Sequence, residues 1–205
     1  MQIHKIYPRG FGANTYVLTN DKKTAVVIDP SGSHVESKLI SLGLKAEYVL
    51  LTHCHFDHVL GVAGLQQSGA RVLCLDKEKP LIGTSADLFE SFGAPRKTYQ
   101  VDEILKDGQE LNLCSIKFKV MHTPGHTIGS ACYFVENDGG RYVFTGDTLF
   151  ENSIGRTDFP TGDIGQIRES LKKLLTFGDM PVFPGHGEDT SIESERKYNS
   201  FLQDL

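Results

Sequence analysis

The histidine-rich segment at residues 52–58, Thr-His-Cys-His-Phe-Asp-His, constrains the fold of this 205-residue chain more than any other feature. It directly follows an apolar run at residues 48–51, which is typical of a strand buried on both faces. Three histidines and one aspartate in six positions would repel one another and be costly to bury without a cation. The rest of the chain must therefore fold so that metal can be held beside them.

The types and spacing of these side chains indicate more than one metal ion. Imidazole nitrogens and carboxylate oxygens suit zinc and iron. In an extended stretch His53 and His55 point the same way, so that this pair can hold one metal. Asp57 and His58 are adjacent and fit that metal poorly, but they can serve a second metal if the chain turns there, as Gly61 permits.

Three more ligand-type residues each follow a predicted strand, on loops shaped by glycine or proline. They are His126 in Thr-Pro-Gly-His-Thr, Asp147 in Thr-Gly-Asp-Thr and His186 in Pro-Gly-His-Gly. Loops beyond strand ends are where α/β proteins build their sites, so the four loops can converge at one sheet edge. Taken singly, a histidine beside a glycine is more often an ordinary surface or capping residue.

Strands and helices are mixed along the chain, so the fold class is α/β or α+β, built from packed layers. The strands predicted from apolar or alternating runs lie at 15–19, 24–28, 48–51, 117–121, 131–135, 142–144 and 181–183. Turns are predicted at 20–23 and 137–140. The sequence has no internal repeat and no linker, so residues 1–205 are expected to form one domain.

Helices are predicted from their capping residues. Ser33 with Glu36, and Thr190 with Glu193, form capping boxes, and Asp163 caps a third helix whose apolar residues follow helical spacing to position 175. A glycine at position 43 ends the first helix.

Composition disfavours several classes of partner. The formal net charge of −5 argues against nucleic-acid and anionic-membrane partners, because both need basic patches. No apolar run approaches the roughly 20 residues that span a bilayer, and the N-terminus has no signal pattern, so a cytoplasmic location is expected. The four cysteines are scattered, as buried thiols in a reducing compartment would be, and Cys54 is expected to be a spacer within the cluster. The oligomeric state stays open.

The segment at 52–58 resembles the H-x-H-x-D-H signature of the metallo-β-lactamase superfamily. Val-Ile-Asp-Pro at 27–30 and the three later motifs are similar to that family's segments, in the same order, and the resemblance extends from Asn14 almost to the C-terminus. It is closest to the short, single-domain glyoxalase II-like hydrolases. Their Gly-Arg-Thr-Asp-Phe segment, at 155–159 here, is shared with the persulfide dioxygenases. The resemblance implies a four-layer αββα sandwich with the site at one edge.

The resemblance also implies two divalent metal ions, for which zinc is expected and iron is accepted by the same ligands. Three histidines would hold the first metal, namely His53, His55 and His126. The second metal would be held by Asp57, His58 and His186. Asp147 would bridge the two metals, and Asp57 and Asp147 are the expected catalytic carboxylates. His122 precedes the Thr-Pro-Gly-His motif and is not carried over.

This chemistry predicts a thioesterase acting on a small molecule. Metal ions lower the pKa of bound water, so that a hydroxide bridging two metals can attack a carbonyl carbon. A thiolate leaves without a strong general acid because its conjugate acid has a pKa of about 8.5. An amine needs protonation, and we can assign no residue to that task. The expected substrate is an S-2-hydroxyacylglutathione such as S-lactoylglutathione, or a related acyl thioester.

Other functions of the same fold stay open. A persulfide dioxygenase would use one iron held by two histidines and a carboxylate, and His58 and His186 would then be surplus. A nuclease, disfavoured by the acidic balance, and a lactonase are weaker alternatives. The chain stops soon after His186, without the helical region that helps the glutathione-thioester specialists to grip glutathione. Arg156 would contact a substrate carboxylate or, as we favour, pair with Asp158 and brace the loop.

Overall fold

The computed structural model describes residues 1–137, 139–203 and 205, and the strands within them form two six-stranded sheets and a small ribbon. The first sheet, in spatial order, contains β1 (Gln2–Ile6), β2 (Thr15–Thr19), β3 (Thr24–Ile28), β4 (Lys45–Leu50), β5 (Arg71–Leu75) and β6 (Glu103–Leu105). The second contains β14 (Thr190–Ser191), β13 (Pro181–Pro184), β10 (Gly140–Gly146), β9 (Ala131–Asn137), β8 (Ile116–His122) and β7 (Glu110–Leu113). The ribbon pairs β11 (Leu149–Phe150) with β12 (Ser153–Ile154).

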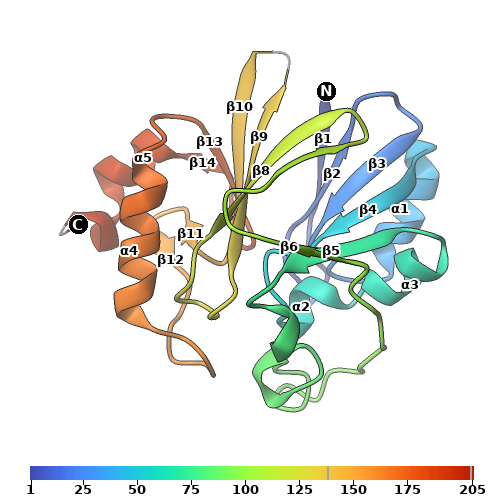
Figure 1. The fold of residues 1–205 in the computed structure, drawn as a ribbon, viewed down its shortest axis with the longest axis horizontal. Coiled ribbons are helices and arrows are strands. Elements are labelled where there is room, and N and C mark those ends of the chain that lie inside the picture. The colour runs from blue at the N-terminus through green and yellow to red at the C-terminus, as the bar shows by residue number, and fades with distance from the viewer. Residues whose placement is uncertain (138, 204) are drawn as a thin grey trace.

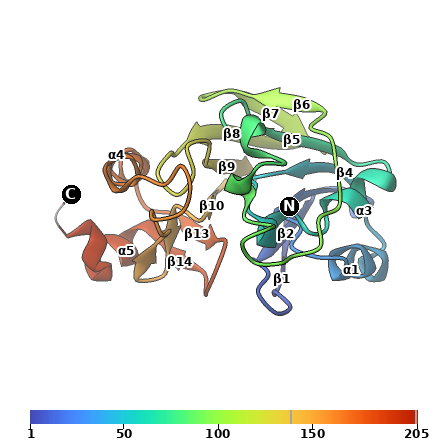
Figure 2. The ribbon, with the colours of Figure 1, turned by 90° about the horizontal axis from the view of Figure 1, so that it is seen from below.

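Helices cover the outer faces of the two sheets. The helices are α1 (His34–Leu42), α2 (Phe56–Val59), α3 (Val62–Gln67), α4 (Ile164–Leu175) and α5 (Ile192–Tyr198), with short 3-10 turns η1 (Lys79–Leu81), η2 (Ser85–Asp87) and η3 (Ser200–Leu202). In Figures 1 and 2, α1 and α3 lie outside the first sheet, and α4 and α5 lie beyond the second. No helix in the described part of the chain combines the length and apolarity needed to cross a membrane.

Three apolar clusters fill the spaces between these layers. Val49 belongs to the cluster between the first sheet and its helices, whereas Leu50 and Phe118 meet between the two sheets. Leu171 of α4 packs in the third cluster, against the second sheet. The αββα sandwich is therefore confirmed, and so is the prediction that the run before the histidine segment is buried on both faces, since Val49 and Leu50 face opposite clusters.

Strand direction brings the predicted ligand loops to one edge. In the first sheet β3 and β4 are parallel, so the loops that follow Ile28 and Leu50 leave the sheet together. In the second sheet β10 and β13 are parallel, and β8 has the same direction because β9 is antiparallel to both β8 and β10. His126, Asp147 and His186 each follow the end of one of these three strands.

The predicted elements overlap observed ones, with differences at turns and caps. The strands β1, β5, β6 and β7, together with the short β11, β12 and β14, are not among those predicted. The helix end at Gly43, with φ of 69°, and the Asp163 cap, which accepts from the Gln166 amide, are confirmed. Of the turn predicted at 137–140, Asp138 lies outside the described residues.

Both capping-box predictions are wrong. Ser33 has helical backbone angles and its hydroxyl makes no capping bond, while Glu36 instead accepts a hydrogen bond from the hydroxyl of Ser68. At the C-terminal helix the cap is Ser191, which accepts from the Ser194 amide. The Thr190 hydroxyl does not cap this helix, because it donates a hydrogen bond to the carboxylate of Glu195 at 2.7 Å.

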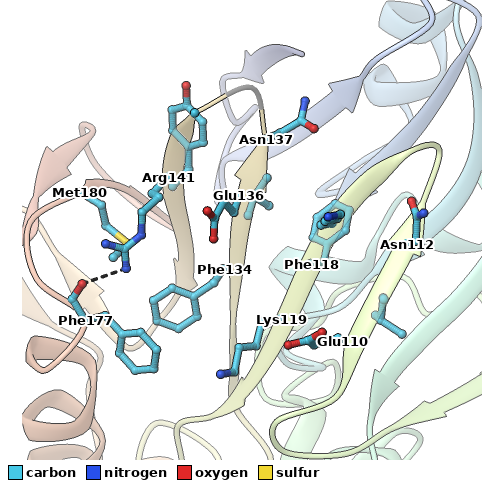
Figure 3. A pocket seen from close by; sticks show the side chains of 15 residues that line it. Glu110, Asn112, Phe118, Lys119, Phe134, Glu136, Asn137, Arg141, Phe177 and Met180 are labelled. Carbon is cyan, nitrogen blue, oxygen red and sulfur yellow. Dashed lines mark hydrogen bonds between the residues drawn. The ribbon is translucent and has the colours of Figure 1, made fainter.

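The outer face of the second sheet is only partly covered by helices. A groove of about 860 Å³ lies over β7, β8, β9 and β10, beside the start of β13. Figure 3 shows Phe134 and Phe177 in contact at one side of it and the Arg141 guanidinium donating to the carbonyl oxygen of Phe177. Charged side chains such as Lys119 and Glu136 line much of the rest, as expected for an antiparallel sheet face that meets water.

Candidate metal centre

Seven ligand-type side chains gather where the strands of both sheets end. Two groups of three can each bring one ligand atom per residue within 4.8 Å of the others. The first group, the first-metal set, contains His53, His55 and His126. The second group, the second-metal set, contains Asp57, His58 and His186. The structure thus brings His126 and His186 beside the residues of the histidine segment with which the family resemblance groups them.

Asp147 lies between the two sets. Its Oδ2 atom is 3.4 Å from Nε2 of His126 in the first-metal set and 3.6 Å from Nε2 of His186 in the second. Its Oδ1 atom is 3.2 Å from Nε2 of His58. One carboxylate therefore faces both groups, and each of its oxygens approaches ring nitrogens that can also face a cation.

Unpartnered polar atoms show that this arrangement fits metal. Nε2 of His53, His55 and His58 and Oδ1 of Asp147 are buried, and none makes a hydrogen bond within the described residues. Each such atom costs about 1–3 kcal/mol if it stays unsatisfied. Nδ1 of His55 also lies 2.9 Å from Nε2 of His126, a separation that requires a shared proton or a common cation. Cations at the two sets would satisfy Nε2 of His53 and His58 and Oδ1 of Asp147, and would fill the close approach of His55 to His126.

Hydrogen bonds behind the rings fix which nitrogen faces the centre. Nδ1 of His126 donates to the carbonyl oxygen of Arg156 at 2.8 Å, and Nδ1 of His58 donates to Oδ2 of Asp29 at 2.9 Å. Since Nδ1 carries a proton in both, Nε2 is the ring nitrogen that faces the centre and is left to bind a cation there.

Asp29 ties the start of the histidine segment to the second-metal set. Its carboxylate accepts from the Thr52 amide at 2.8 Å and from the Thr52 hydroxyl at 2.5 Å, besides the ring of His58. Its backbone has φ of 50°, which is unusual for a residue other than glycine. Asp29 also joins His53 and His58 in a third possible group, but these bonds already occupy its oxygens, so we assign it as a brace.

The two sets differ in electrostatics. Burial lowers the pKa of His53 well below its usual range and that of His55 to about 3, and neighbouring imidazoles add to the effect. Burial also acts to lower the pKa of His58, but the carboxylates of Asp147 and Asp57 outweigh it and raise that pKa well above its usual value. The pKa of His186 is raised too, since Asp147 and Asp57 outweigh burial. His53 and His55 of the first-metal set therefore stay neutral, whereas the carboxylates of the second-metal set favour a positive charge at His58 and His186, where a cation can take the place of the protons.

The second-metal set is the more open side of the centre. The side chain of His186 is 37% exposed and that of Asp57 is 15% exposed, whereas His58 is fully buried. A Cβ atom on Gly185 would lie 2.3 Å from Oδ1 of Asp147, so only glycine lets the chain pass this close. The ring of Phe150 flanks His186, with centroids 5.9 Å apart. A ligand can therefore approach from the side of His186 and Asp57.

The side chain of Arg156 is engaged by residues outside the two ligand sets. Its guanidinium makes two 2.6 Å hydrogen bonds to the carboxylate of Asp158 and lies 3.8 Å over the ring of Phe159. Only its carbonyl oxygen meets the centre, through His126. This geometry supports the bracing interpretation.

The remaining histidine and cysteine of interest lie outside the ligand sets. Nε2 of His122 donates to the carbonyl oxygen of Ile128 at 2.8 Å, and His122 belongs to neither set. Cys54 is fully buried, and burial raises the pKa of its thiol well above the usual range, so it is an unreactive group.

Two bracing residues are absent from the sequence interpretation. The amide of Asn14 donates to the carbonyl oxygens of Pro184 and Gly187, both at 3.0 Å, and so holds the loop of His186. Glu78 is fully buried and accepts hydrogen bonds from two ligand loops. Asn14 marks the start of the family resemblance, whereas Glu78 has no sequence signal because it lies in a run of charged residues.

Comparison with known proteins agrees with this fold. The family model of the Metallo-beta-lactamase superfamily matches residues 8–186. A relative from Haemophilus influenzae, named hydroxyacylglutathione hydrolase GloC, is 35% identical, with 98% of each chain covered. Among solved structures, the BLEG-1 B3 metallo-β-lactamase is similar with a TM-score of 0.90 and 33% identity over 98% of this chain and 99% of that one. The structure of TTHA1623 in a di-iron-bound form is similar with a TM-score of 0.84 and 31% identity, over 98% of this chain and 100% of that one.

Proposed function

Since this chain belongs to the metallo-β-lactamase superfamily, we propose that it is a metal-dependent thioesterase of the glyoxalase II type. Its proposed substrate is a small-molecule thioester, an S-2-hydroxyacylglutathione such as S-lactoylglutathione or a related acyl thioester. The observation that carries the proposal is the complete second-metal set beside the first, with Asp147 facing both. The relative named hydroxyacylglutathione hydrolase, which matches over nearly its whole length, supports the choice of substrate.

The proposed cofactors are two divalent metal ions, for which zinc is our expectation and iron the alternative. His53, His55 and His126 would hold one ion, Asp57, His58 and His186 the other, and Asp147 would face both. Bound there, the ions would supply an activated water and a Lewis-acidic face for the substrate carbonyl. The similarity to a protein solved in a di-iron-bound form supports a two-ion site and keeps iron as a candidate.

The two carboxylates of the centre are proposed to have different roles in the reaction. Asp57 is the partly open carboxylate, with Oδ2 3.1 Å from Nε2 of His186, and it is proposed to orient the attacking water and to accept its proton. Asp147 is proposed to fix the spacing of the two sets, because it contacts both. The leaving group is assigned as a thiolate, since a thiolate departs without being protonated by the protein.

A persulfide dioxygenase with a single iron is the alternative that the site must be tested against. Two histidines and a carboxylate are enough for such a site, and His126 with Asp147 and one further histidine of the first-metal set would supply them. The second-metal set would then have no purpose. Its complete ligand complement is therefore the reason to favour the hydrolase.

Two assays on one preparation separate these functions. The zinc-loaded protein is expected to release thiol from S-lactoylglutathione or a simpler acyl thioester. The iron-loaded protein is expected to consume negligible oxygen with glutathione persulfide, measured with an oxygen electrode. Lactone and β-lactam substrates complete the panel. Robust oxygen uptake without thioester cleavage would overturn the proposal and leave the fold unchanged.

A further inference from the structure

We propose that the buried side chain of Glu78 is a positioning residue that sets the geometry of the first-metal set by joining the two loops that carry it. This inference rests on the proposed two-metal function. Glu78 precedes the 3-10 turn η1 and lies outside the ligand motifs.

The two oxygens of Glu78 reach one ligand loop each. Oε1 accepts from the backbone amide of Cys54 at 2.7 Å, and Cys54 stands between His53 and His55. Oε2 accepts from the hydroxyl of Thr127 at 2.7 Å, and Thr127 directly follows His126. One carboxylate thus links the chain positions next to all three histidines of the first-metal set.

The environment of Glu78 makes this link specific. The residue is fully buried, and an ionised carboxylate without partners would be very costly there. A Cβ atom on Gly129 would lie 2.2 Å from the backbone nitrogen of Glu78, so the loop of His126 packs directly on this residue. The His126 loop can approach Glu78 so closely only with glycine at that position.

The second-metal set is held by other residues. His58 is braced by Asp29, and the loop of His186 is braced by Asn14. Within the described residues, the Glu78 carboxylate makes no hydrogen bond to His58 or to the loop of His186. Loss of its carboxylate should therefore weaken the first-metal set and leave the second nearly unchanged, which a general loss of stability would not do.

The two sets can be titrated separately with Co²⁺. His186→Ala leaves only the first-metal set complete, and His55→Ala leaves only the second complete. In the His186→Ala background, Glu78→Ala is expected to weaken Co²⁺ binding about 10- to 100-fold, the usual effect of removing a group that orients ligands. In the His55→Ala background the same change should leave Co²⁺ affinity within about threefold, because no second-set ligand is touched.

Glu195 provides a matched control. It is also a fully buried glutamate that accepts from a backbone amide, that of Asn152 at 2.8 Å, and from a threonine hydroxyl, that of Thr190 at 2.7 Å. It differs from Glu78 in accepting a further bond, from the side-chain amide of Asn199 at 2.8 Å. Both Glu195→Ala and Glu78→Ala should lower the unfolding midpoint of the metal-free protein, but Glu195→Ala should leave the Co²⁺ affinity of the first-metal set unchanged.

A conservative variant completes the test. In Glu78→Gln the amide oxygen can accept from Cys54, and the amide nitrogen can donate to the Thr127 hydroxyl, whose proton can turn to Ser130 at 2.8 Å. Glu78→Gln should therefore restore Co²⁺ affinity to within about threefold of the parent. Unchanged affinity in Glu78→Ala, or equal losses at both sets, overturns this inference alone. Failure of the His186→Ala parent to bind Co²⁺ overturns the proposed function and this inference with it.

Discussion

Nδ1 of His58 donates a hydrogen bond to Oδ2 of Asp29 at 2.9 Å, and the Thr52 hydroxyl donates to the same oxygen. Asp29→Asn tests what this contact does, and asparagine tolerates the positive φ of the site. An amide nitrogen in place of Oδ2 would face two hydrogen-bond donors, Nδ1 of His58 and the Thr52 hydroxyl. The His58 ring would then carry its proton on Nε2 instead of Nδ1, and Nε2 would have no lone pair to offer the metal. We expect second-metal affinity to fall about 10- to 100-fold in a Co²⁺ titration. Unchanged affinity would show that Asp29 does not set the tautomer.

Asp147→Asn should weaken both metal sites and sharply lower turnover. The carboxylate faces both sets, and it offsets part of the repulsion between two neighbouring cations. Metal content after dialysis and thiol release measure the two effects. His122→Ala is the control, since that ring bonds to Ile128 and joins neither set. Loss of metal in His122→Ala, with His126→Ala unaffected, would show that the ligands are wrongly assigned.

Acidification should empty the second-metal set before the first. Burial holds the pKa of His55 at about 3, so protons do not compete for that ring above this pH. The pKa values of His58 and His186 are raised, since nearby carboxylates outweigh burial, so protons compete for these two rings at a higher pH than for an ordinary histidine. Lowering the pH from about 7 to about 5 in the presence of a chelator should remove one metal first. Elemental analysis across the series checks this, and simultaneous loss of both metals would contradict it.

Arg156→Ala should leave the Michaelis constant for glutathione thioesters nearly unchanged. The guanidinium is engaged with Asp158 and Phe159, and only the main-chain carbonyl of Arg156 meets the centre. The comparison needs one glutathione thioester and one acyl thioester whose thiol lacks a carboxylate. A rise of about tenfold or more for the glutathione thioester alone, equal to about 1.4 kcal/mol, would instead assign Arg156 to substrate binding.

The sequence motifs predict the ligand residues of the site better than the residues that hold those ligands in place. His53 and His55 fall in one ligand set, as predicted from the alternation of side chains along an extended segment, which is a local rule even outside a strand. The same kind of reasoning finds Asp163 as a cap, since a capping bond spans only three residues. Ligand residues stand out in sequence because few other environments place several histidines so close together.

Hydrogen-bond partners that are distant in the sequence could not be predicted. Glu36 and Thr190 leave their expected capping roles because Ser68 and Glu195 compete for them, and that competition exists only in the folded chain. Glu78 stands among charged neighbours that suggest an exposed loop, yet it is fully buried against residues 24 and 49 positions away. Neither contact leaves a local pattern to detect.

The number of metal ions per chain tests the central claim most directly. The protein is purified without oxygen, replenished with zinc, freed of loosely bound ions and analysed for metal and protein together. Two ligand sets that share Asp147 predict two zinc ions per chain, and one ion after His186→Ala. Saturation of the unmodified chain at a single ion, with Asp57 and His58 free of metal, would contradict the account.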